Sequence, residues 1–421
     1  MVWSLFARLS GGAWRRMARP FGAALLVALT LVVSACGAGT SGNGGAPSPT
    51  PKPSATRTPP PCDSWRIVSS PNLTHLRDNE LLAVSALSPT AAWAVGGALT
   101  DGLAEQSLIE RWDGSAWKIV PNPNTLSFFT VVALSPTDAW VIGYNRTPRQ
   151  VGRITLIERW NGQQWSEVPN PNPHEPNYFT LGMAANGANE VWAVGQAFTP
   201  ANISLPLTER WDGSAWKIVA NPALPGVTEG LLYAVAHVPG SDQFWAVGYA
   251  LTGPRPAYEQ PLIERWDGSA WQVVASPTLP SGALGGRLHG VTARAANDIW
   301  AVGDYTASDH TLRALTVHWD GVAWKVVTSP NTWGTLSSVA VASANDVRAV
   351  GYALASDGNT RHALIEQWNG ASWQIATRPE PTGATYSNLT GIATDGSGGY
   401  WAVGSYLNAA GVEQTLTARC P

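Results

Sequence analysis

The sequence predicts an all-β protein built from seven copies of one repeat, and two patterns support this. A tryptophan hairpin, clearest as Trp112-Asp113-Gly114-Ser115-Ala116-Trp117, returns five more times in complete form. A short strand that ends in glycine, such as Trp93-Ala94-Val95-Gly96, occurs seven times. The first hairpin tryptophans recur every 48 to 55 positions while the motifs stay constant, so the variation in length falls in loops. The tryptophans expected to be structural are Trp112, Trp117, Trp160, Trp165, Trp211, Trp216, Trp266, Trp271, Trp319, Trp324, Trp368 and Trp373.

Each repeat contains four short segments with strand character. In the first complete repeat they are residues 82–86, 92–96, 108–112 and 117–120, which are rich in Val, Ile and Trp and bounded by turn formers. Asp-Gly or Asn-Gly separates the third and fourth segments, because a tight hairpin needs positive φ there. Each repeat is therefore predicted to be a sheet of four antiparallel strands.

Such small sheets cannot cover both of their faces alone, but radial packing lets each sheet cover the next. We therefore predict a seven-bladed β-propeller whose first strands line the central axis. The middle of each first strand is small, as expected where seven backbones crowd together: Ala83, Thr130, Gly182, Ala234, Gly290, Ser338 and Gly391. We expect these inner strands to contain no Arg, Lys, Asp or Glu.

The two chain ends complete one repeat between them. The last repeat stops at Cys420-Pro421 without a fourth strand, whereas residues 62–72 copy the pattern of residues 117–122. The N-terminal segment is predicted to supply the outer strand of the last blade and so to close the ring. Cys62 and Cys420 would then meet where the hairpin turn is absent, which predicts a disulfide. The alternative is two free cysteines.

The first segment is predicted to be an export signal. Arginines precede an apolar run, residues 21–35, which is shorter than the roughly 20 residues needed to span a bilayer. The run closes on Val33-Ser34-Ala35-Cys36, which resembles the bacterial lipobox and implies cleavage before Cys36 and its lipidation. The alternative is an ordinary signal peptide with Cys36 as a bystander. The predicted organisation is a lipoprotein signal peptide (1–35), a lipidated cysteine with a Gly/Ser/Thr/Pro-rich tether (36–61) and the propeller (62–421).

Composition narrows the classes of partner. The chain is 44% hydrophobic with a formal net charge of -3, which is unlike a nucleic-acid-binding protein. We expect no nucleic-acid partner, attachment to the outer face of the membrane through the lipid anchor, and an unknown protein or glycan partner.

The order of the Val95–Gly97, Leu108–Trp112 and Asp113–Pro121 segments resembles the kelch repeat and the central domain of galactose oxidase, and this resemblance covers residues 62–421. Only the first repeat has the glycine doublet, Gly96-Gly97; the later repeats have Gly-Tyr, Gly-Gln, Gly-Asp or Gly-Ser. The resemblance implies a propeller but not a function. A copper centre like that of galactose oxidase would need a cysteine near a Tyr-His cluster, which the sequence lacks.

No catalytic motif stands out, and no cofactor or metal is expected. His237 and His289 fall on adjacent inner strands, but without a third ligand they are interpreted as packed or water-bound rather than as a metal pair. Recurrent Glu-Arg pairs are interpreted as bracing in which a glutamate of one blade meets an arginine of its neighbour. These pairs are 110/111, 158/159, 209/210 and 264/265.

Recognition is expected in the loops between the second and third strands, because these differ between repeats. The candidate ligand-binding residues there are Arg146, Arg149, Arg153, Asp309, His310, Arg313, Asp357, Arg361 and His362. The sequence favours a non-catalytic, lipid-anchored binding module at the cell surface. The alternatives are a propeller enzyme acting on glycans or small molecules and a purely structural component of the envelope.

Overall fold

The structure is a computed structural model that describes residues 64–74, 76–99, 105–122, 127–145, 154–171, 178–201, 203–253, 258–331 and 333–421. The chain divides into two units, residues 1–57 and 58–421, and every described residue belongs to the second. The predicted signal peptide, Cys36, the tether and Cys62 lie outside the described residues, so the statements about them stay predictions. None of the described residues forms a helix able to cross a membrane.

All regular secondary structure in the described residues is β, in 28 strands. The first strands of repeats one to seven are β2 (Arg77–Ser88), β6 (Phe128–Ser135), β10 (Tyr178–Ala185), β14 (Val227–His237), β18 (Gly285–Ala295), β22 (Gly334–Ser343) and β26 (Tyr386–Thr394). The second strands are β3 (Ala91–Leu99), β7 (Asp138–Asn145), β11 (Val191–Phe198), β15 (Phe244–Thr252), β19 (Asp298–Thr306), β23 (Asp346–Leu354) and β27 (Tyr400–Leu407).

The third strands are β4 (Glu105–Trp112), β8 (Ile154–Trp160), β12 (Ser204–Trp211), β16 (Gln260–Trp266), β20 (Leu312–Trp319), β24 (Arg361–Trp368) and β28 (Glu413–Cys420). The fourth strands are β5 (Trp117–Ile119), β9 (Trp165–Glu167), β13 (Trp216–Val219), β17 (Trp271–Val273), β21 (Trp324–Val327) and β25 (Trp373–Ile375), and β1 (Arg66–Val68) takes this place beside β28. Within each repeat, neighbouring strands pair antiparallel.

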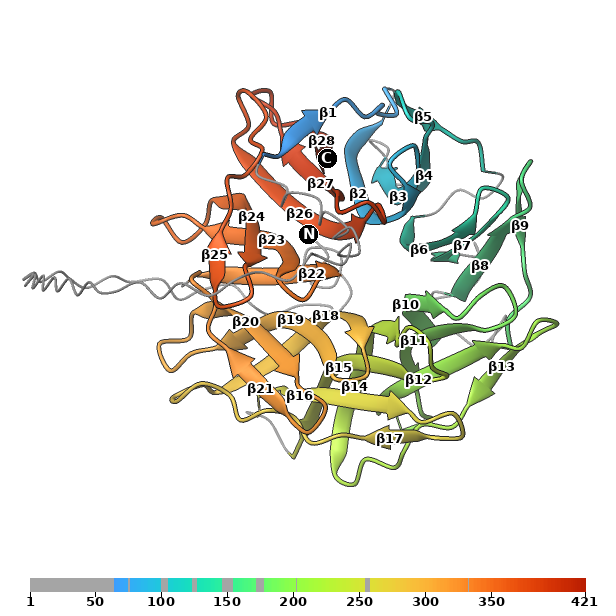
Figure 1. Cartoon of the computed structure of the whole chain (residues 1–421), viewed down its shortest axis with the longest axis vertical. Helices are drawn as coiled ribbons and strands as arrows, with labels where there is room; N and C mark the ends of the chain where they lie inside the picture. The colour runs from blue at the N-terminus through green and yellow to red at the C-terminus, as the bar shows by residue number, and fades with distance from the viewer. Residues whose placement is uncertain are drawn as a thin grey trace, which may run out of the picture. The chain divides into compact units, whose positions relative to one another are not determined.

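These four-stranded antiparallel units form a β-propeller, with the first strands nearest the centre and the fourth strands at the rim (Figure 1). Five of the units are separate sheets, whereas repeats three and four share one sheet through a single parallel pair, Ser204 with Glu229. The N-terminal strand β1 pairs with the C-terminal strand β28, Ile67 lying opposite Ala418. The sequence predicted this partnership. Cys420, at the end of β28, is buried and disulfide-bonded, but the pairing with Cys62 stays a prediction.

The tryptophan hairpins have the predicted geometry. Trp112 lies opposite Trp117 in register, and the turn glycines of the six complete hairpins have φ between 93° and 101°. The Asp113 carboxylate accepts 2.9 Å hydrogen bonds from the backbone N–H groups of Ser115 and Ala116. The aspartate or asparagine of every other complete hairpin accepts the same pair of bonds, which explains the fixed Asp-Gly or Asn-Gly.

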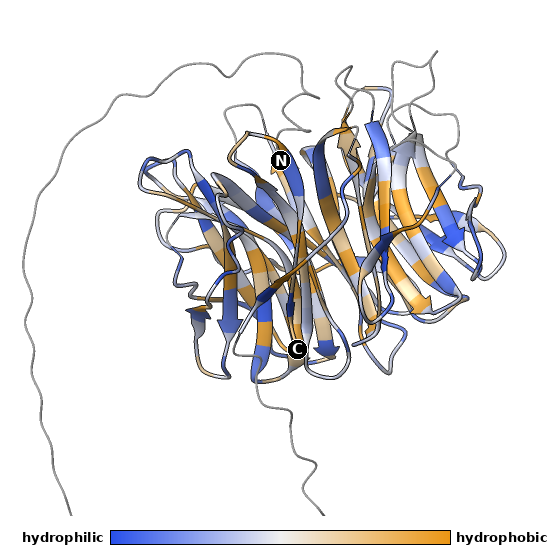
Figure 2. Cartoon of the chain, turned by 90° about the horizontal axis from the view of Figure 1, so that it is seen from above, coloured by the Kyte–Doolittle hydropathy of each residue, from blue (hydrophilic) through white to orange (hydrophobic). Residues whose placement is uncertain are grey.

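The hairpin tryptophans also join neighbouring repeats. Trp93 of repeat one packs edge-on against Trp160 and Trp165 of repeat two, with both centroid distances 5.2 Å. Trp401 of repeat seven packs in the same way on Trp112 and Trp117 of repeat one, at 4.9 and 5.0 Å. Apolar residues gather within the strands and polar residues toward their ends (Figure 2), so the core lies between adjacent sheets.

Close approach of backbones near the axis explains the small residues in the first strands. A Cβ added to Gly391 would lie 3.0 Å from the Ala83 Cα of repeat one, and one added to Gly290 would lie 3.0 Å from the Ser338 Cα of repeat six. The expectation that small side chains let the inner strands crowd together is confirmed.

The Glu-Arg pairs brace the sheets in a different way from the one predicted. The glutamates bond to a serine or asparagine in the link from the preceding repeat, as in Ser70 to Glu110 and Asn221 to Glu264. Two of the arginines instead pair with acids of their own repeat, Arg159 with Asp138 and Arg210 with Glu190, both at 2.8 Å, while Arg111 donates a 3.3 Å hydrogen bond to the Pro136 carbonyl of the next repeat. Adjacent strand positions point to opposite faces, so the two members of each pair reach different partners. The expectation that these glutamates meet neighbouring arginines was wrong.

Candidate functional site

The non-repeated polar residues gather at one end of the propeller, where the first strands begin and the second strands end. The position after each Val-Gly or Ile-Gly breaks the repeat and is buried in all seven copies: Gly97, Tyr144, Gln196, Tyr249, Asp304, Tyr352 and Ser405. Facing residues on the first strands vary as well, including Glu80, Leu231, Arg287, Thr335 and Asn388. We call this end of the axis, defined by these two sets, the polar mouth.

The inner strands carry charged residues, contrary to the sequence prediction. Strands β2, β14 and β18 begin earlier than expected and include Glu80, Glu229 and Arg287 in their first halves. The predicted strands covered only the apolar middles, because polar residues at a strand end resemble loop residues in sequence. The added length places these charges at the polar mouth.

Repeats four and five contribute a network of tyrosine, arginine and carboxylate groups. The Tyr249 hydroxyl donates a 2.6 Å hydrogen bond to Glu229, and the Arg287 guanidinium pairs with Glu259 at 2.6 Å. Arg287 also lies over the Tyr249 ring, 5.3 Å from its centroid. Strands β14, β15 and β18 and the segment before β16 thereby place a cation, two acids and a phenol beside one another.

His289 and Asp304 of repeat five link this network to repeat six. The His289 Nε2 lies 2.7 Å from Asp304 Oδ2, which also accepts a 2.8 Å hydrogen bond from Thr335. The imidazole packs against the Tyr233 ring at a centroid distance of 4.9 Å. His237 instead contacts the Ser241 carbonyl at 2.7 Å, so the two histidines have different hydrogen-bond partners. Among the described residues, no group of His, Cys, Asp or Glu is arranged to hold a metal ion.

The electrostatics keep the tyrosines neutral and Asp304 ionised. Burial raises the pKa of Tyr233 and of Tyr249, so their hydroxyls remain protonated. Burial of Asp304 opposes ionisation, but contacts with His289, Arg287 and Thr335 outweigh it and lower the pKa of Asp304. The network thus presents neutral hydroxyls beside fixed charges.

One of the predicted ligand-binding residues, Arg361, contacts the polar mouth. Arg361 lies over the Tyr352 ring at 4.2 Å, and its Nη1 donates to the Tyr386 hydroxyl at 3.4 Å. His362 Nδ1 lies 3.4 Å from Glu380 Oε1. The structure therefore joins Arg361 to the ring of variable residues through Tyr352, whereas His362 contacts Glu380, outside the residues that define the mouth.

The other predicted residues of repeats five and six organise their own loops. Asp309 accepts bonds from the Thr311 backbone and pairs with Arg313 at 2.8 Å, and Asp357 accepts bonds from the Asn359 and Thr360 backbones. His310 has a φ of 62°, and its Nδ1 lies 3.4 Å from the Tyr258 hydroxyl. Arg146, Arg149 and Arg153 lie outside the described residues.

Exposed aromatic side chains flank the polar mouth. Tyr258, in the segment before β16, is 38% exposed, and Trp333, just before β22, is 36% exposed. Both segments lie at the end of the sheets that carries the polar mouth, because β16 and β22 begin there. Their rings offer apolar faces next to the polar network.

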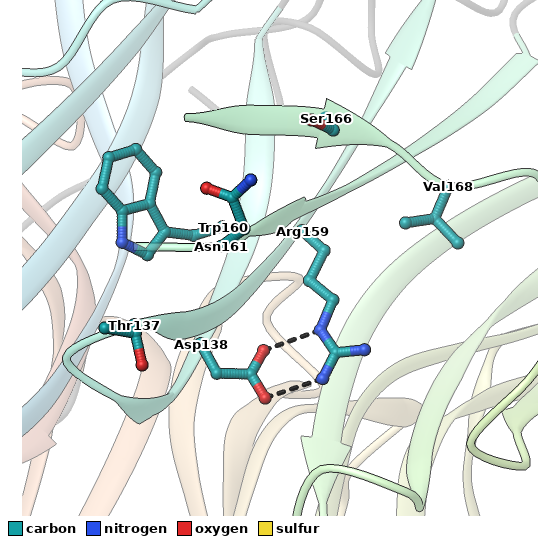
Figure 3. Close-up of a pocket in the computed structure, with 7 residues that line it drawn as sticks. All are labelled: Thr137, Asp138, Arg159, Trp160, Asn161, Ser166 and Val168. Carbon is teal, nitrogen blue, oxygen red and sulfur yellow. Dashed lines mark hydrogen bonds and ion pairs between the residues drawn. The ribbon is translucent and has the colours of Figure 1, made fainter. Parts of the chain in front are cut away.

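A separate pocket of about 460 Å³ lies beside the hairpin of repeat two (Figure 3). The Asp138–Arg159 ion pair lines this pocket (Figure 3), and its two oxygen–nitrogen distances are both 2.8 Å. Its lining includes Trp160 and Asn161 of the repeated hairpin. Because other repeats carry the equivalent acid–arginine pair, this pocket belongs to the scaffold.

The comparisons with known proteins define the fold only. No protein-family model and no curated protein matches the chain. A PL25 ulvan lyase bound to GlcA(1-4)Rha3S is similar with a TM-score of 0.51 and 8% identity over 83% of this chain and 95% of the lyase. The GH74 xyloglucanase from Xanthomonas campestris is similar with a TM-score of 0.50 and 13% identity over 84% of this chain and 55% of the enzyme. YCF48 bound to a D1 peptide is similar with a TM-score of 0.49 and 15% identity over 85% of this chain and 94% of YCF48.

Proposed function

We propose that the protein is a cell-surface binding module that holds a hydroxyl-rich glycan at the polar mouth of a closed, seven-bladed, kelch-like propeller. The observation that carries the proposal is the concentration of buried, non-repeated polar groups around Arg287, Tyr249 and Asp304. Residues at a repeated position stabilise the scaffold. Polar groups that are buried in only some repeats, at one end of the axis, are better explained by ligand binding.

The chemistry of the network favours a sugar. Neutral phenols, carboxylates, an imidazole and a guanidinium together supply donors and acceptors for several hydroxyl groups. The Arg287 charge is offset by Glu259 at 2.6 Å, so this arginine is suited to hydrogen bonding rather than to capturing a free anion. The exposed rings of Tyr258 and Trp333 offer surfaces on which a sugar ring can stack.

The proposed location at the cell surface rests on the sequence. The lipobox-like segment ending at Cys36 would anchor the chain, the tether would hold the propeller away from the membrane, and a Cys62–Cys420 disulfide would lock the paired chain ends. The β1–β28 pairing supports ring closure, and the 28 strands support seven blades of four. Such a module would present its polar mouth outside the cell.

A glycan array probed with the full chain tests the proposal. The double variant Arg287→Met/Glu259→Gln removes both charges of the pair together, and we expect it to lose the glycan signal of the wild type. Arg111→Met is the matched control, because Arg111 lies over the scaffold residue Trp93 at 5.2 Å. Loss of signal in the control alone, or no glycan signal in the wild type, would refute the proposal.

A second candidate is an enzyme that acts on the bound glycan. The His289–Asp304 contact favours it, because a carboxylate that orients an imidazole is a common arrangement for proton transfer. The test is the release of reducing ends from a bound oligosaccharide by the wild type and by Asp304→Asn. Release that stops in the variant supports catalysis, and an unchanged oligosaccharide supports binding alone.

A further inference from the structure

A cluster of hydrogen-bond acceptors lies at the polar mouth where repeat seven meets repeat one. It is separate from Arg287, which belongs to repeat five. Asn388 of β26 faces Ser405 of β27 in register, so their side chains share one face of the sheet. Ser405 donates a 2.7 Å hydrogen bond to Glu413 of β28. Three adjacent strands thus bring an amide, a hydroxyl and a carboxylate together.

Repeat one adds a second carboxylate at the same level. The Thr390 hydroxyl of β26 donates a 2.7 Å hydrogen bond to the carbonyl of Leu81, the residue after Glu80 in β2. Strand β2 also packs against β26, β27 and β28. Glu80 therefore lies beside the Asn388–Glu413 group, and the two carboxyls interact electrostatically.

The side chain of Asn388 carries a buried, unsatisfied hydrogen-bond acceptor. The residue is only 4% exposed, and its Oδ1 has no hydrogen-bond partner. Burying such an atom lowers stability, so it calls for an explanation. Repeat four has Leu231 at the equivalent register position, opposite Tyr249, which shows that the scaffold does not need an amide there. An acceptor that the fold leaves unsatisfied is available to a donor on a ligand.

The surroundings of the cluster are acidic. Asp78 interacts electrostatically with both Glu80 and Glu413, Glu105 does so with Glu80, and Tyr386 lies within the electrostatic reach of both glutamates. Arg361 is a cation beside Tyr386, and it is engaged with the rings of Tyr352 and Tyr386. Burial and the neighbouring acids raise the pKa of Glu80 to about 7 and the pKa of Glu413 to about 8.

We propose that Asn388, Glu80 and Glu413 form a binding site for a primary ammonium group carried by a ligand. An ammonium group is a compact charge with three donors, which suits acceptors that approach from different strands. A metal ion is disfavoured, because the described residues include no set of ligands arranged for one. The site stands on residues of repeats seven and one, apart from the Arg287–Tyr249 network proposed to hold a glycan.

The test measures the affinity of the full chain for Nα-acetyl-lysine methylamide and for its Nε-acetylated form, by ligand-detected NMR. The lysine derivative is expected to bind at least ten times more tightly than the acetylated form. Asn388→Leu should weaken binding of the lysine derivative about tenfold without lowering the melting temperature, because it removes an unsatisfied acceptor. Glu80→Gln/Glu413→Gln should abolish that binding.

Asp267→Asn is the control, since it removes one negative charge at a hairpin position where repeats two and six already have Asn161 and Asn369. Its affinity should equal that of the wild type. Affinity should also rise between about pH 6 and pH 8.5 as the two carboxyls ionise while the amine stays charged. Equal affinity for the two probes, unchanged affinity in Asn388→Leu, or no binding at about 10 mM probe would overturn the proposal.

Discussion

Asn221, in the link that follows the outer strand of repeat three, donates a 2.7 Å hydrogen bond to the buried carboxyl of Glu264 in repeat four. The same relationship joins Ser70 to Glu110 at 2.8 Å and Ser329 to Glu366 at 2.7 Å. In each case a glutamate at a fixed position of the repeat holds the link that leads in from the repeat before it. These glutamates brace the propeller rather than line its polar mouth.

The bracing glutamates predict a pH-dependent stability. Burial raises the pKa of Glu264 from 4.5 to about 7, so the folded protein binds a proton that the unfolded chain releases. The stability that the protonated Glu264 carboxyl contributes is therefore fully present below about pH 4.5 and is lost as the pH rises through 7. Glu264→Gln should match the wild type at pH 5 and exceed it at pH 8 by at most about 3 kcal/mol in chemical unfolding. A variant less stable than the wild type at pH 8 would contradict this.

Arg210 should contribute to stability and not to ligand binding. It pairs with Glu190 at 2.8 Å and lies over the Trp192 and Trp266 rings at 5.6 and 5.9 Å. Arg210→Ala is expected to cost about 1 kcal/mol in denaturant unfolding, because it removes a partly exposed ion pair and a cation–π contact. Loss of glycan binding with an unchanged melting temperature would show that the arginine is not a bracing residue.

Crowding at the axis makes Gly391 intolerant of a side chain. Its added Cβ would lie 3.0 Å from the Ala83 Cα and 3.2 Å from the Leu82 carbonyl oxygen, so backbone must move. Gly391→Val should destabilise the protein by about 1–3 kcal/mol. Ser338→Ala, at the same place in repeat six, adds no volume and should change stability by less than about 1 kcal/mol. Equal effects of the two substitutions would argue against the crowded axis.

The predicted Cys62–Cys420 disulfide implies a strong effect of reduction. Joining positions 62 and 420 would stabilise the fold by about 5 kcal/mol at most in the chain-entropy model. Cys420→Ser and reduction of the wild type should lower the melting temperature equally, while Cys36→Ser should leave it unchanged. Peptide mapping under non-reducing conditions checks the pairing, and a peptide that joins any other two cysteines would refute it.

The sequence predicts the scaffold well because the scaffold is periodic. The Asp-Gly or Asn-Gly turns, the facing tryptophans and the small residue near the axis are each required once per repeat, so they recur at recognisable offsets. The partnership of residues 66–68 with the last strand could also be predicted, since the missing fourth strand and its copy are both visible in the sequence.

The polar mouth was harder to predict, because its residues are the ones that do not recur. Variation between repeats is expected in loops, and Arg361 and His362 are among the candidates because they stand at the junction of a variable loop and strand β24. Tyr249, Asp304 and Ser405 sit one place after the Val-Gly motif, where the missing glycine doublet was the available signal. Which of these residues meet across repeats, such as Asp304 with Thr335, depends on strand register, and the sequence pattern does not predict register to within one residue.

The location of a bound oligosaccharide in a crystal structure tests the central claim most directly. The claim is that non-repeated residues at the polar mouth bind ligand while the repeated hairpins only build the ring. We expect sugar hydroxyls within hydrogen-bonding distance of Tyr249, Arg287 or His289, with a sugar ring against Tyr258 or Trp333. An oligosaccharide bound instead in the hairpin pocket beside Asp138 and Arg159, with the mouth empty, would contradict the claim.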